Sequence, residues 1–316
     1  MRTTGAATPG YRHEIGFYSS EEEFHDLIVP FAVEALGQGE PVVFAYDAYK
    51  TDLLRSWLVE DAAVTHVSGR SPYSSPARAL AAWRAIAEQE IAAGAPRVRV
   101  AGDVPHPGYG VPYVGWDRYE AAIDTALGHL PVWARCCYDT RIAPADVLAL
   151  AGRLHRHRIE PSGRQSPNPG FAAVLQLGQF LAPVPEPLEQ SPPTVELVAP
   201  TPVAARSVVD QVARSRVGDA VADDLRQAVS EVVANGVRHG LPPVVVRVWA
   251  GTDRVVVHVH DAGGGPADPL VGLVPVDGDG SEAGRGLWLS HLLDVDVALL
   301  PSDDGFTVRL DARAAG

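Results

Sequence analysis

The chain has 316 residues, of which 46% are hydrophobic and 21% charged, an ordinary globular composition that excludes collagen-like, coiled-coil and disordered chains. The length suggests two domains of roughly 150 residues each. The 26 basic and 39 acidic residues give a formal net charge of −13. Because there is also no basic run, we expect no direct contact with nucleic acid.

No apolar run reaches the length of about 18 residues that a transmembrane helix needs, so we expect no membrane span. The first residues show no signal-peptide pattern, and we therefore expect a cytoplasmic protein. The two cysteines, Cys136 and Cys137, are adjacent, so we expect neither a disulfide framework nor a zinc cage. They are interpreted as core residues, with redox sensing as the alternative. The only lysine is Lys50, so the chain has no G-K-[ST] phosphate-binding loop.

A proline-rich stretch separates two parts of the chain that differ in their sequence pattern. Proline neither continues a helix nor donates along a sheet ladder, so residues 161–195 are predicted to be a linker. An apolar patch at 171–181 could form a short docking helix within it. The predicted domains are then residues 11–160 and 196–316.

The N-terminal part alternates apolar strands with amphipathic helices, the pattern of an α/β fold with a mainly parallel sheet. The predicted strands are 41–46, 97–101 and 131–138, and the predicted helices are 21–36, 76–93 and 119–130.

The C-terminal part instead groups its helices and strands, which predicts an α+β two-layer sandwich with the helices on one face of the sheet. The predicted elements are helices 202–216 and 221–239, strands 244–249 and 255–261, a helix from about 287 and a last strand 306–310. Alternation along the second strand places His258 and His260 on the face away from the helices. This face is predicted to be the wet side of the sheet rather than a metal site, because no third ligand is visible nearby.

Three polar motifs in this part could carry chemistry. Glu231, Asn235 and His239 recur every four residues and form one stripe of a helix, where amide and carboxylate oxygens suit a hydrated Mg²⁺. Asp261 ends a strand before three glycines, which let backbone approach a flat ligand. The third motif, Gly284-Arg285-Gly286-Leu287, opens a helix whose free N–H groups favour phosphate. Each motif alone is weak, since a polar helix face or a turn explains it equally well.

Taken in order, the three motifs resemble the N, G1 and G2 boxes of the GHKL ATPases, which include the ATP-binding domains of gyrase and of histidine kinases. Residues 228–239 are especially similar to the anti-sigma-factor serine kinases. The resemblance implies a GHKL (Bergerat) fold that binds ATP and Mg²⁺, with Asn235 as metal ligand, Asp261 on the adenine amine and Glu231 as general base. It assigns residues 266–283 to an ATP lid, and Gly264-Gly265-Pro266 departs from the family pattern. The remaining nucleotide-binding residues that it implies are His239, Gly263, Gly265, Gly284, Arg285, Gly286 and Leu287.

The N-terminal part resembles the MEDS sensory domain. The residues that carry this similarity are 13–18, 37–40, 98–103, Tyr119-Glu120 and 136–139. The resemblance implies a RecA/KaiC-like fold without a phosphate-binding loop and a sensory role for an unknown small-molecule or redox signal. His13 could bind such a ligand, although a structural histidine is the simpler interpretation.

The two resemblances together imply a regulator in which a sensory domain controls an ATP-dependent anti-sigma factor and serine kinase. The expected partners are a sigma factor and a serine-bearing anti-sigma antagonist, and a homodimer is left open. Two alternatives remain: a non-catalytic ATP-binding interaction module and a histidine-kinase-like sensor. The second is disfavoured because the proline-rich linker offers no dimerising helical hairpin with a phosphoacceptor histidine.

Overall fold

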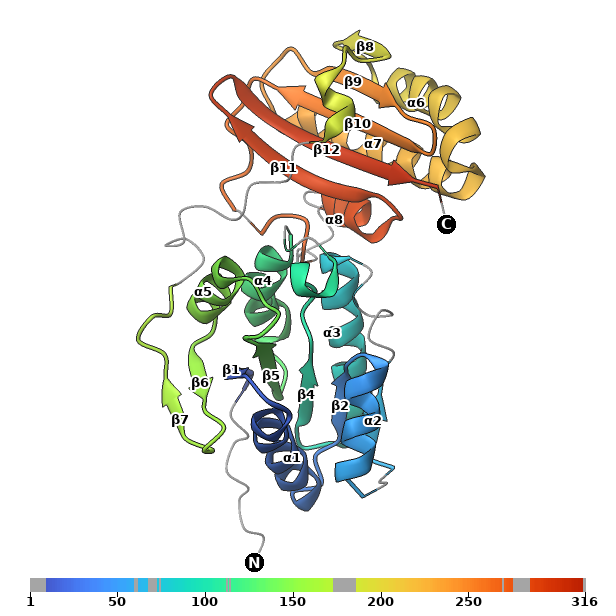
Figure 1. Cartoon of the computed structure of the whole chain (residues 1–316). Coiled ribbons are helices and arrows are strands. Elements are labelled where there is room, and N and C mark those ends of the chain that lie inside the picture. Colours follow the sequence, from blue (N-terminus) through green and yellow to red (C-terminus); the bar gives the residue numbers. More distant parts are fainter. Residues whose placement is uncertain are drawn as a thin grey trace, which may run out of the picture. The chain divides into compact units, whose positions relative to one another are not determined.

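A computed structural model of the chain (Figure 1) describes residues 10–59, 62–67, 73, 75–111, 113, 115–172, 186–268, 270–274 and 285–314. It divides into two compact units, Met1–Phe180 and Leu181–Gly316. Most of the apolar patch at 171–181 lies outside the described residues. None of the described helices combines the length and apolarity needed to cross a bilayer.

The described residues of the first unit form a seven-stranded sheet in the order β3-β2-β4-β5-β1-β6-β7. All neighbouring strands are parallel except β7, which returns antiparallel to β6. The strands are β1 (Arg12–Tyr18), β2 (Val42–Ala45), β3 (Val64–His66), β4 (Val98–Gly102), β5 (Val132–Asp139), β6 (His157–Ile159) and β7 (Gln165–Pro167). The predicted α/β class with a mainly parallel sheet is confirmed.

Helices cover both faces of this sheet. Phe24, Leu27, Ile28 and Phe31 of α1 recur at helical spacing and pack with Leu54 of α2 against one face. On the opposite face α4 contacts β5, and α3 and α5 pack beside α4. The helices are α1 (Glu21–Gly37), α2 (Ala48–Trp57), α3 (Pro76–Ala92), α4 (Trp116–Leu127), α5 (Ala145–Leu154) and the 3₁₀ turn η2 (Pro107–Tyr109).

Local signals located most of these helices. Ser20 and Ser75 cap α1 and α3 by accepting backbone N–H bonds, and both helices lie where the apolar periodicity predicts them. α4 instead runs about three residues earlier than predicted, between Gly115 and Gly128. The sequence analysis missed α2, a short and polar helix that Asp47 caps, and the short strand β3 that follows it. It also missed α5 and the short strands β6 and β7.

The second unit contains an antiparallel sheet in the order β11-β12-β10-β9-β8, assembled from described residues. α6 and α7 pack on one face of it, which confirms the predicted antiparallel α+β arrangement. Valines of β9 and β10 supply the sheet side of this core. The elements are η4 (Pro187–Gln190), β8 (Val195–Val198), α6 (Pro202–Val217), α7 (Asp219–His239), β9 (Val245–Ala250), β10 (Arg254–Asp261), α8 (Arg285–Leu292), β11 (Asp296–Ser302) and β12 (Gly305–Arg313).

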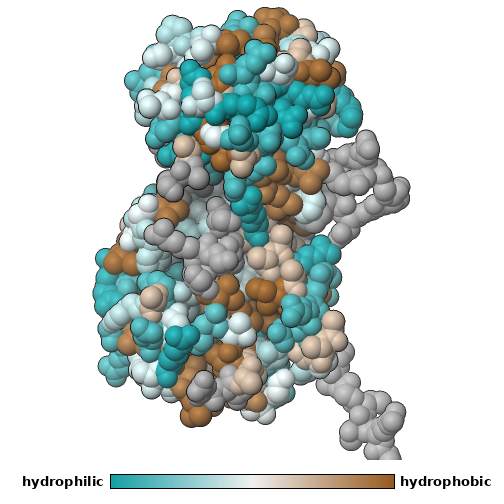
Figure 2. All heavy atoms as spheres, turned by 90° about the vertical axis from the view of Figure 1, so that its right-hand side faces the viewer, coloured by the Kyte–Doolittle hydropathy of each residue, from teal (hydrophilic) through white to brown (hydrophobic). Residues whose placement is uncertain are grey.

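The outer face of this sheet is partly covered, so the prediction of a wet side holds only for part of it. Val256 is fully buried there, and His258 lies 3.0 Å from the Glu189 carboxylate of η4. The indole N–H of Trp249 donates to the Ser191 carbonyl at 2.8 Å. Residues 186–191, which the sequence analysis placed in the linker, therefore form a strap across the outer face. On the side of the molecule drawn in Figure 2, hydrophilic and hydrophobic residues are interspersed on both units.

We predict that the strap stabilises the second unit. A fragment of residues 186–316 should resist urea better than a fragment of residues 195–316, by about 1–3 kcal/mol in free energy of unfolding. This range reflects the loss of the Trp249 and His258 hydrogen bonds when residues 186–194 are removed. Urea denaturation of the two fragments measures the difference, and equal midpoints would show that the strap contributes nothing.

Candidate functional site

The polar stripe of α7 lies at the edge of the second unit's core. Glu231 and Asn235 are half-buried, whereas Val232 and Val233 between them are buried in the core. His239, the last residue of α7, is exposed. The helix therefore holds Glu231 and Asn235 on one side, one turn apart, with their side chains still accessible.

The first turn of α8 lies against this stripe. A Cβ atom on Gly286 would lie 2.6 Å from Oε2 of Glu231 and 3.5 Å from Nδ2 of Asn235. A side chain at this position would push the Glu231 carboxylate aside, so the close approach uses the glycine. The backbone N–H groups that open α8 and its positive dipole end therefore lie beside a carboxylate and an amide, an arrangement suited to a phosphate bound with a cation.

Asp261 is clasped by glycine-rich backbone at the end of β10. The carboxylate is 8% exposed, and its Oδ1 accepts the N–H groups of Gly263 at 2.8 Å and Leu241 at 3.1 Å. Its Oδ2 receives no hydrogen bond from any residue that the structure describes. A Cβ atom on Gly236 would lie 4.0 Å from Oδ2, so this oxygen lies next to α7. Asp261 therefore has one fixed oxygen and one that can accept a hydrogen bond from a ligand.

The other predicted nucleotide-binding residues fall into three groups. Gly263 belongs to the Asp261 clasp, and a Cβ atom there would lie 2.7 Å from Oδ1. Gly265 has a φ of +73° and packs against the Phe306 ring, and Leu287 is buried in the core. Gly284 and the side chain of Arg285 lie outside the described residues. Their contact with a nucleotide stays a prediction.

Part of the predicted lid is packed onto α8. Gly272 has a φ of +80°, and a Cβ atom there would lie 2.7 Å from Cγ of Leu287. Leu273 is 2% exposed. The segment from 270 to 274 is therefore anchored to α8, whereas residues 269 and 275–283 lie outside the described part.

We predict that Gly240→Ala weakens ATP binding by about tenfold or more without unfolding the domain. Gly240 has a φ of −83°, which alanine adopts without strain. A Cβ atom there would lie 2.4–2.6 Å from the Asp261 carboxyl group and would displace it. Isothermal titration with ATP measures the loss, and Gly264→Ala is the matched control because nothing lies within 4 Å of a Cβ at that position. Equal ATP affinity in the two variants would show that Asp261 does not take part in nucleotide binding.

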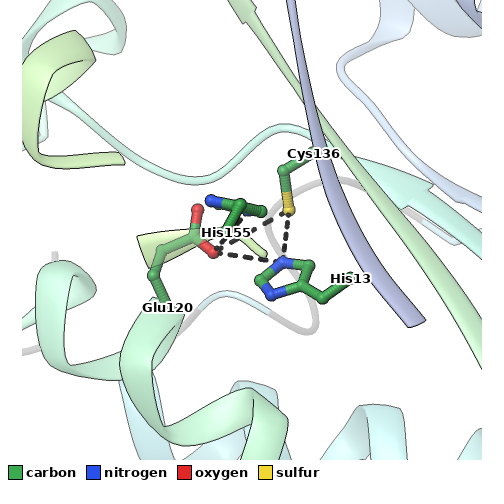
Figure 3. Close-up of side chains that lie close together, drawn as sticks. All are labelled: His13, Glu120, Cys136 and His155. Carbon is green, nitrogen blue, oxygen red and sulfur yellow. Dashed lines mark hydrogen bonds and ion pairs between the residues drawn. The ribbon is translucent and has the colours of Figure 1, made fainter. Parts of the chain in front are cut away.

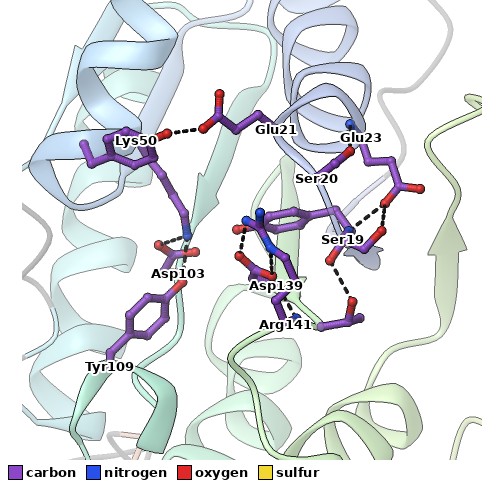
Figure 4. Close-up of polar contacts among 12 residues, drawn as sticks. Ser19, Ser20, Glu21, Glu23, Lys50, Asp103, Tyr109, Asp139 and Arg141 are labelled. Atoms are coloured by element: carbon purple, nitrogen blue, oxygen red, sulfur yellow. Dashed lines mark hydrogen bonds and ion pairs between the residues drawn. The ribbon is translucent and has the colours of Figure 1, made fainter.

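In the first unit, polar side chains gather where the parallel strands end (Figure 4). Parallel α/β sheets commonly bind ligands at this edge. After β1, however, Ser20 accepts the N–H of Glu23, and the Glu23 carboxylate accepts the Ser19 N–H at 2.6 Å. Together with Glu21 and Glu22, this makes the start of α1 internally satisfied and acidic, which disfavours an anion such as phosphate.

Lys50 is paired at the same edge. Its ammonium group donates to Oδ2 of Asp103 at 2.6 Å and to the Tyr109 hydroxyl at 2.7 Å, and the residue is 7% exposed. Burial raises the pKa of Asp103 to about 6, against the lowering effect of the Lys50 ammonium. Burial, aided by the Lys50 charge, lowers the pKa of His106 to about 4, so this neighbouring imidazole is neutral near pH 7. The edge therefore holds one buried ion pair.

We predict that Lys50→Met destabilises the first unit by about 3–5 kcal/mol, because it leaves the Asp103 carboxylate buried without its partner. Adding Asp103→Asn removes the unpaired charge, so the double variant should recover part of the loss. Urea denaturation of the single and double variants measures both effects.

The loss should also depend on pH. The folded-state pKa of Asp103, about 6, lies above its ordinary value of 3.8, so the folded state binds more protons between these values. Stability contributed by this group therefore falls as pH rises through that window. Removing Lys50 removes an influence that lowers this pKa, so Lys50→Met should cost less at pH 5 than at pH 8. A pH-independent cost would contradict this assignment.

A second cluster lies inside the first unit and brings together His13, Glu120, Cys136 and His155, all buried. The sequence analysis considered His13 and Cys136 separately and did not connect them with Glu120 or His155. The signal that could have joined them is alternation along β5, which sends Cys136 toward α4 and Cys137 toward α1. It could be used only once the order of the strands was known.

Comparison with protein families defines the two parts. Residues 12–156 match the family model described as "MEDS: MEthanogen/methylotroph, DcmR Sensory domain", and residues 197–311 match "Histidine kinase-like ATPase domain". No curated protein matched the chain significantly. The protein is thus a fusion of a sensory domain and a kinase-like ATPase domain. More specifically, it carries a MEDS domain at the N-terminus and a GHKL-type ATPase domain at the C-terminus, the combination expected from the sequence.

Proposed function

We propose that the protein is a signalling regulator whose C-terminal domain binds ATP with Mg²⁺ and acts as an anti-sigma factor and serine kinase. The observation that carries the proposal is the contact of Gly286 with Glu231 and Asn235. It joins two motifs that are some 50 residues apart in the chain and each uninformative alone. The match to the kinase-like ATPase family supports nucleotide binding at this place.

The residues present fit a nucleotide with its cation. The open Oδ2 of Asp261 is suited to accept a hydrogen bond from the adenine amine, and the start of α8 is suited to the phosphates. Asn235 would hold Mg²⁺ through its amide oxygen, and the ion would neutralise phosphate charge. Exposed His239 could contact the nucleotide from the end of α7.

Glu231 is the proposed general base. Its Oε2 lies beside Gly286, next to the place assigned to the phosphates, so it could accept a proton from a serine hydroxyl that attacks there. The proposed substrate is a serine of an anti-sigma antagonist, and the proposed binding partner is a sigma factor. Phosphorylation of the antagonist would change the availability of the sigma factor.

The N-terminal domain is proposed to control this activity as a RecA/KaiC-like sensory module that does not use ATP itself. The acidic and internally capped start of α1 supports this view, because a phosphate-binding loop needs free N–H groups and a cation there. A small-molecule or redox signal would therefore act through this domain.

We predict that Glu231→Gln retains ATP and sigma-factor binding but loses phosphotransfer by roughly 10²-fold or more, because glutamine keeps the shape and removes the basicity. Transfer of label from Mg-ATP to a candidate antagonist measures the rate. A rate within about threefold of wild type would indicate that Glu231 is only a helix-surface residue.

Asp261→Asn tests the assigned role of Asp261 in ATP binding. The amide cannot offer the same pair of acceptor oxygens, so this variant should lose ATP binding while keeping its fold.

The wild-type protein distinguishes the alternative functions. If it binds ATP tightly and never labels an antagonist, the domain is a non-catalytic interaction module. Acid-labile autophosphate would instead indicate a histidine kinase.

A further inference from the structure

The buried cluster of His13, Glu120, Cys136 and His155 is assembled from four separate elements. His13 is on β1, Glu120 on α4 and Cys136 on β5, and His155 directly follows α5. All four side chains point to one centre (Figure 3), and the residues are at most 8% exposed. One donor atom from each residue lies within 4.8 Å of all the others.

Four of the six separations between these donor atoms are close to those of a tetrahedron around a metal ion. Nε2 of His13 lies 3.3 Å from Sγ of Cys136 and 3.5 Å from Oε2 of Glu120. The same Oε2 lies 3.5 Å from Nε2 of His155 and 3.8 Å from Sγ. Tetrahedral zinc with bonds of about 2.0–2.3 Å places its ligand atoms about 3.3–3.7 Å apart.

The outer ring nitrogens of the two histidines make the hydrogen bonds that are usual for metal-bound histidines. Nδ1 of His13 lies 3.1 Å from the Asp124 carboxylate, and Nδ1 of His155 lies 2.8 Å from the Ala151 carbonyl. Both acceptors fix the hydrogen on Nδ1 and leave the Nε2 lone pairs directed inward. Metal-bound histidines characteristically donate their second N–H to a carboxylate or a carbonyl in this way.

The inward side of the cluster has more acceptors than donors. Nε2 of His155 has no hydrogen-bond partner within the described part of the chain, although it is buried. The Tyr138 hydroxyl donates to Oε1 of Glu120 at 2.5 Å, so the other carboxylate oxygen, Oε2, faces the centre. With both imidazoles neutral, a single thiol hydrogen cannot satisfy Oε2 and both Nε2 lone pairs. A cation at the centre would satisfy all of them.

We propose that His13, Glu120, Cys136 and His155 bind one divalent transition-metal ion, with zinc as the preferred ion. Binding releases the thiol proton of Cys136 to solvent and forms a thiolate–metal bond, with no change of oxidation state. The set of two imidazole nitrogens, one sulfur and one carboxylate oxygen suits zinc, whereas Mg²⁺ and Ca²⁺ prefer oxygen ligands. Four protein ligands close the site, the pattern of structural zinc.

The neighbouring cysteine provides a matched control. Cys137 is 3% exposed, nearly as buried as Cys136, and is also a free thiol. Because side chains alternate along β5, it belongs to the core on the α1 side of the sheet. Serine at either position makes the same chemical change, but only Cys136→Ser removes a proposed ligand.

Cobalt binding by the full-length chain tests the proposal. Chelator-stripped protein is titrated with Co²⁺, and thiolate-to-cobalt charge-transfer absorption is recorded. We expect the band to saturate at one equivalent, to disappear when Zn²⁺ is added, to be absent in Cys136→Ser and to persist in Cys137→Ser. A folded wild-type protein without this band, or a band that depends on Cys137 instead, would overturn the proposal.

A variant outside the proposed ligand set tests the site even if the cysteine variants fail to fold. Asp124→Asn changes a quarter-exposed side chain that contacts the outer nitrogen of His13 through Oδ1 and lies 3.7 Å from the Arg156 guanidinium through Oδ2. It should weaken zinc affinity by about 10–100-fold, the usual effect of removing a carboxylate behind a metal-bound histidine. Competition with a chromophoric chelator measures this affinity. Unchanged zinc affinity in folded Asp124→Asn would contradict the assigned role of His13.

Discussion

The alternation of side chains along a β-strand is the constraint on which both candidate sites depend. On β5 it places Cys136 beside Glu120 of α4, whereas Cys137 enters the core under α1. On β10 it turns Val257, Val259 and Asp261 toward the helices. A shift of either strand by one residue would exchange its faces and dismantle the site, so strand register and site geometry are inseparable.

The two domains solve the problem of buried polar groups differently. The sensory domain pairs its buried charges: Lys50 with Asp103, Arg99 with Glu40, and Arg135 with Glu14. The pairing is necessary because an uncompensated buried charge costs several kcal/mol. The ATPase domain keeps its charged site near the surface and lets glycine backbone approach it instead. Around Asp261 the N–H groups of Gly263 and Leu241 replace a counter-charge.

This difference agrees with the proposed division of function between the domains. In the first unit, the acidic start of α1 and the paired Lys50 leave the sheet edge unsuited to phosphate. In the second, the first turn of α8 lies beside Glu231 and Asn235. A parallel sheet therefore does not by itself make a nucleotide site. The residues that follow its strands decide this.

Local patterns predicted most helices, and resemblance to a known family identified the ATPase motifs. Apolar periodicity located α1, α3, α6 and α7, and the spacing of Glu231 and Asn235 placed both on one side of α7. These features depend on neighbours within one or two turns, so the sequence carries them directly. The same reasoning did not find the helices α2 and α5 or the strands β3, β6, β7, β8 and β11.

Only the tertiary structure decided which distant residues meet. Placing β1 between β5 and β6 brings His13 to Cys136 and His155, and folding the strap onto the outer sheet face buries the environment of His258. These contacts follow from strand order and from covering an exposed sheet face, both of which depend on the packing free energy of the whole domain. Local propensity does not determine the order of the strands, because each segment would form the same helix or strand in a sheet of another order.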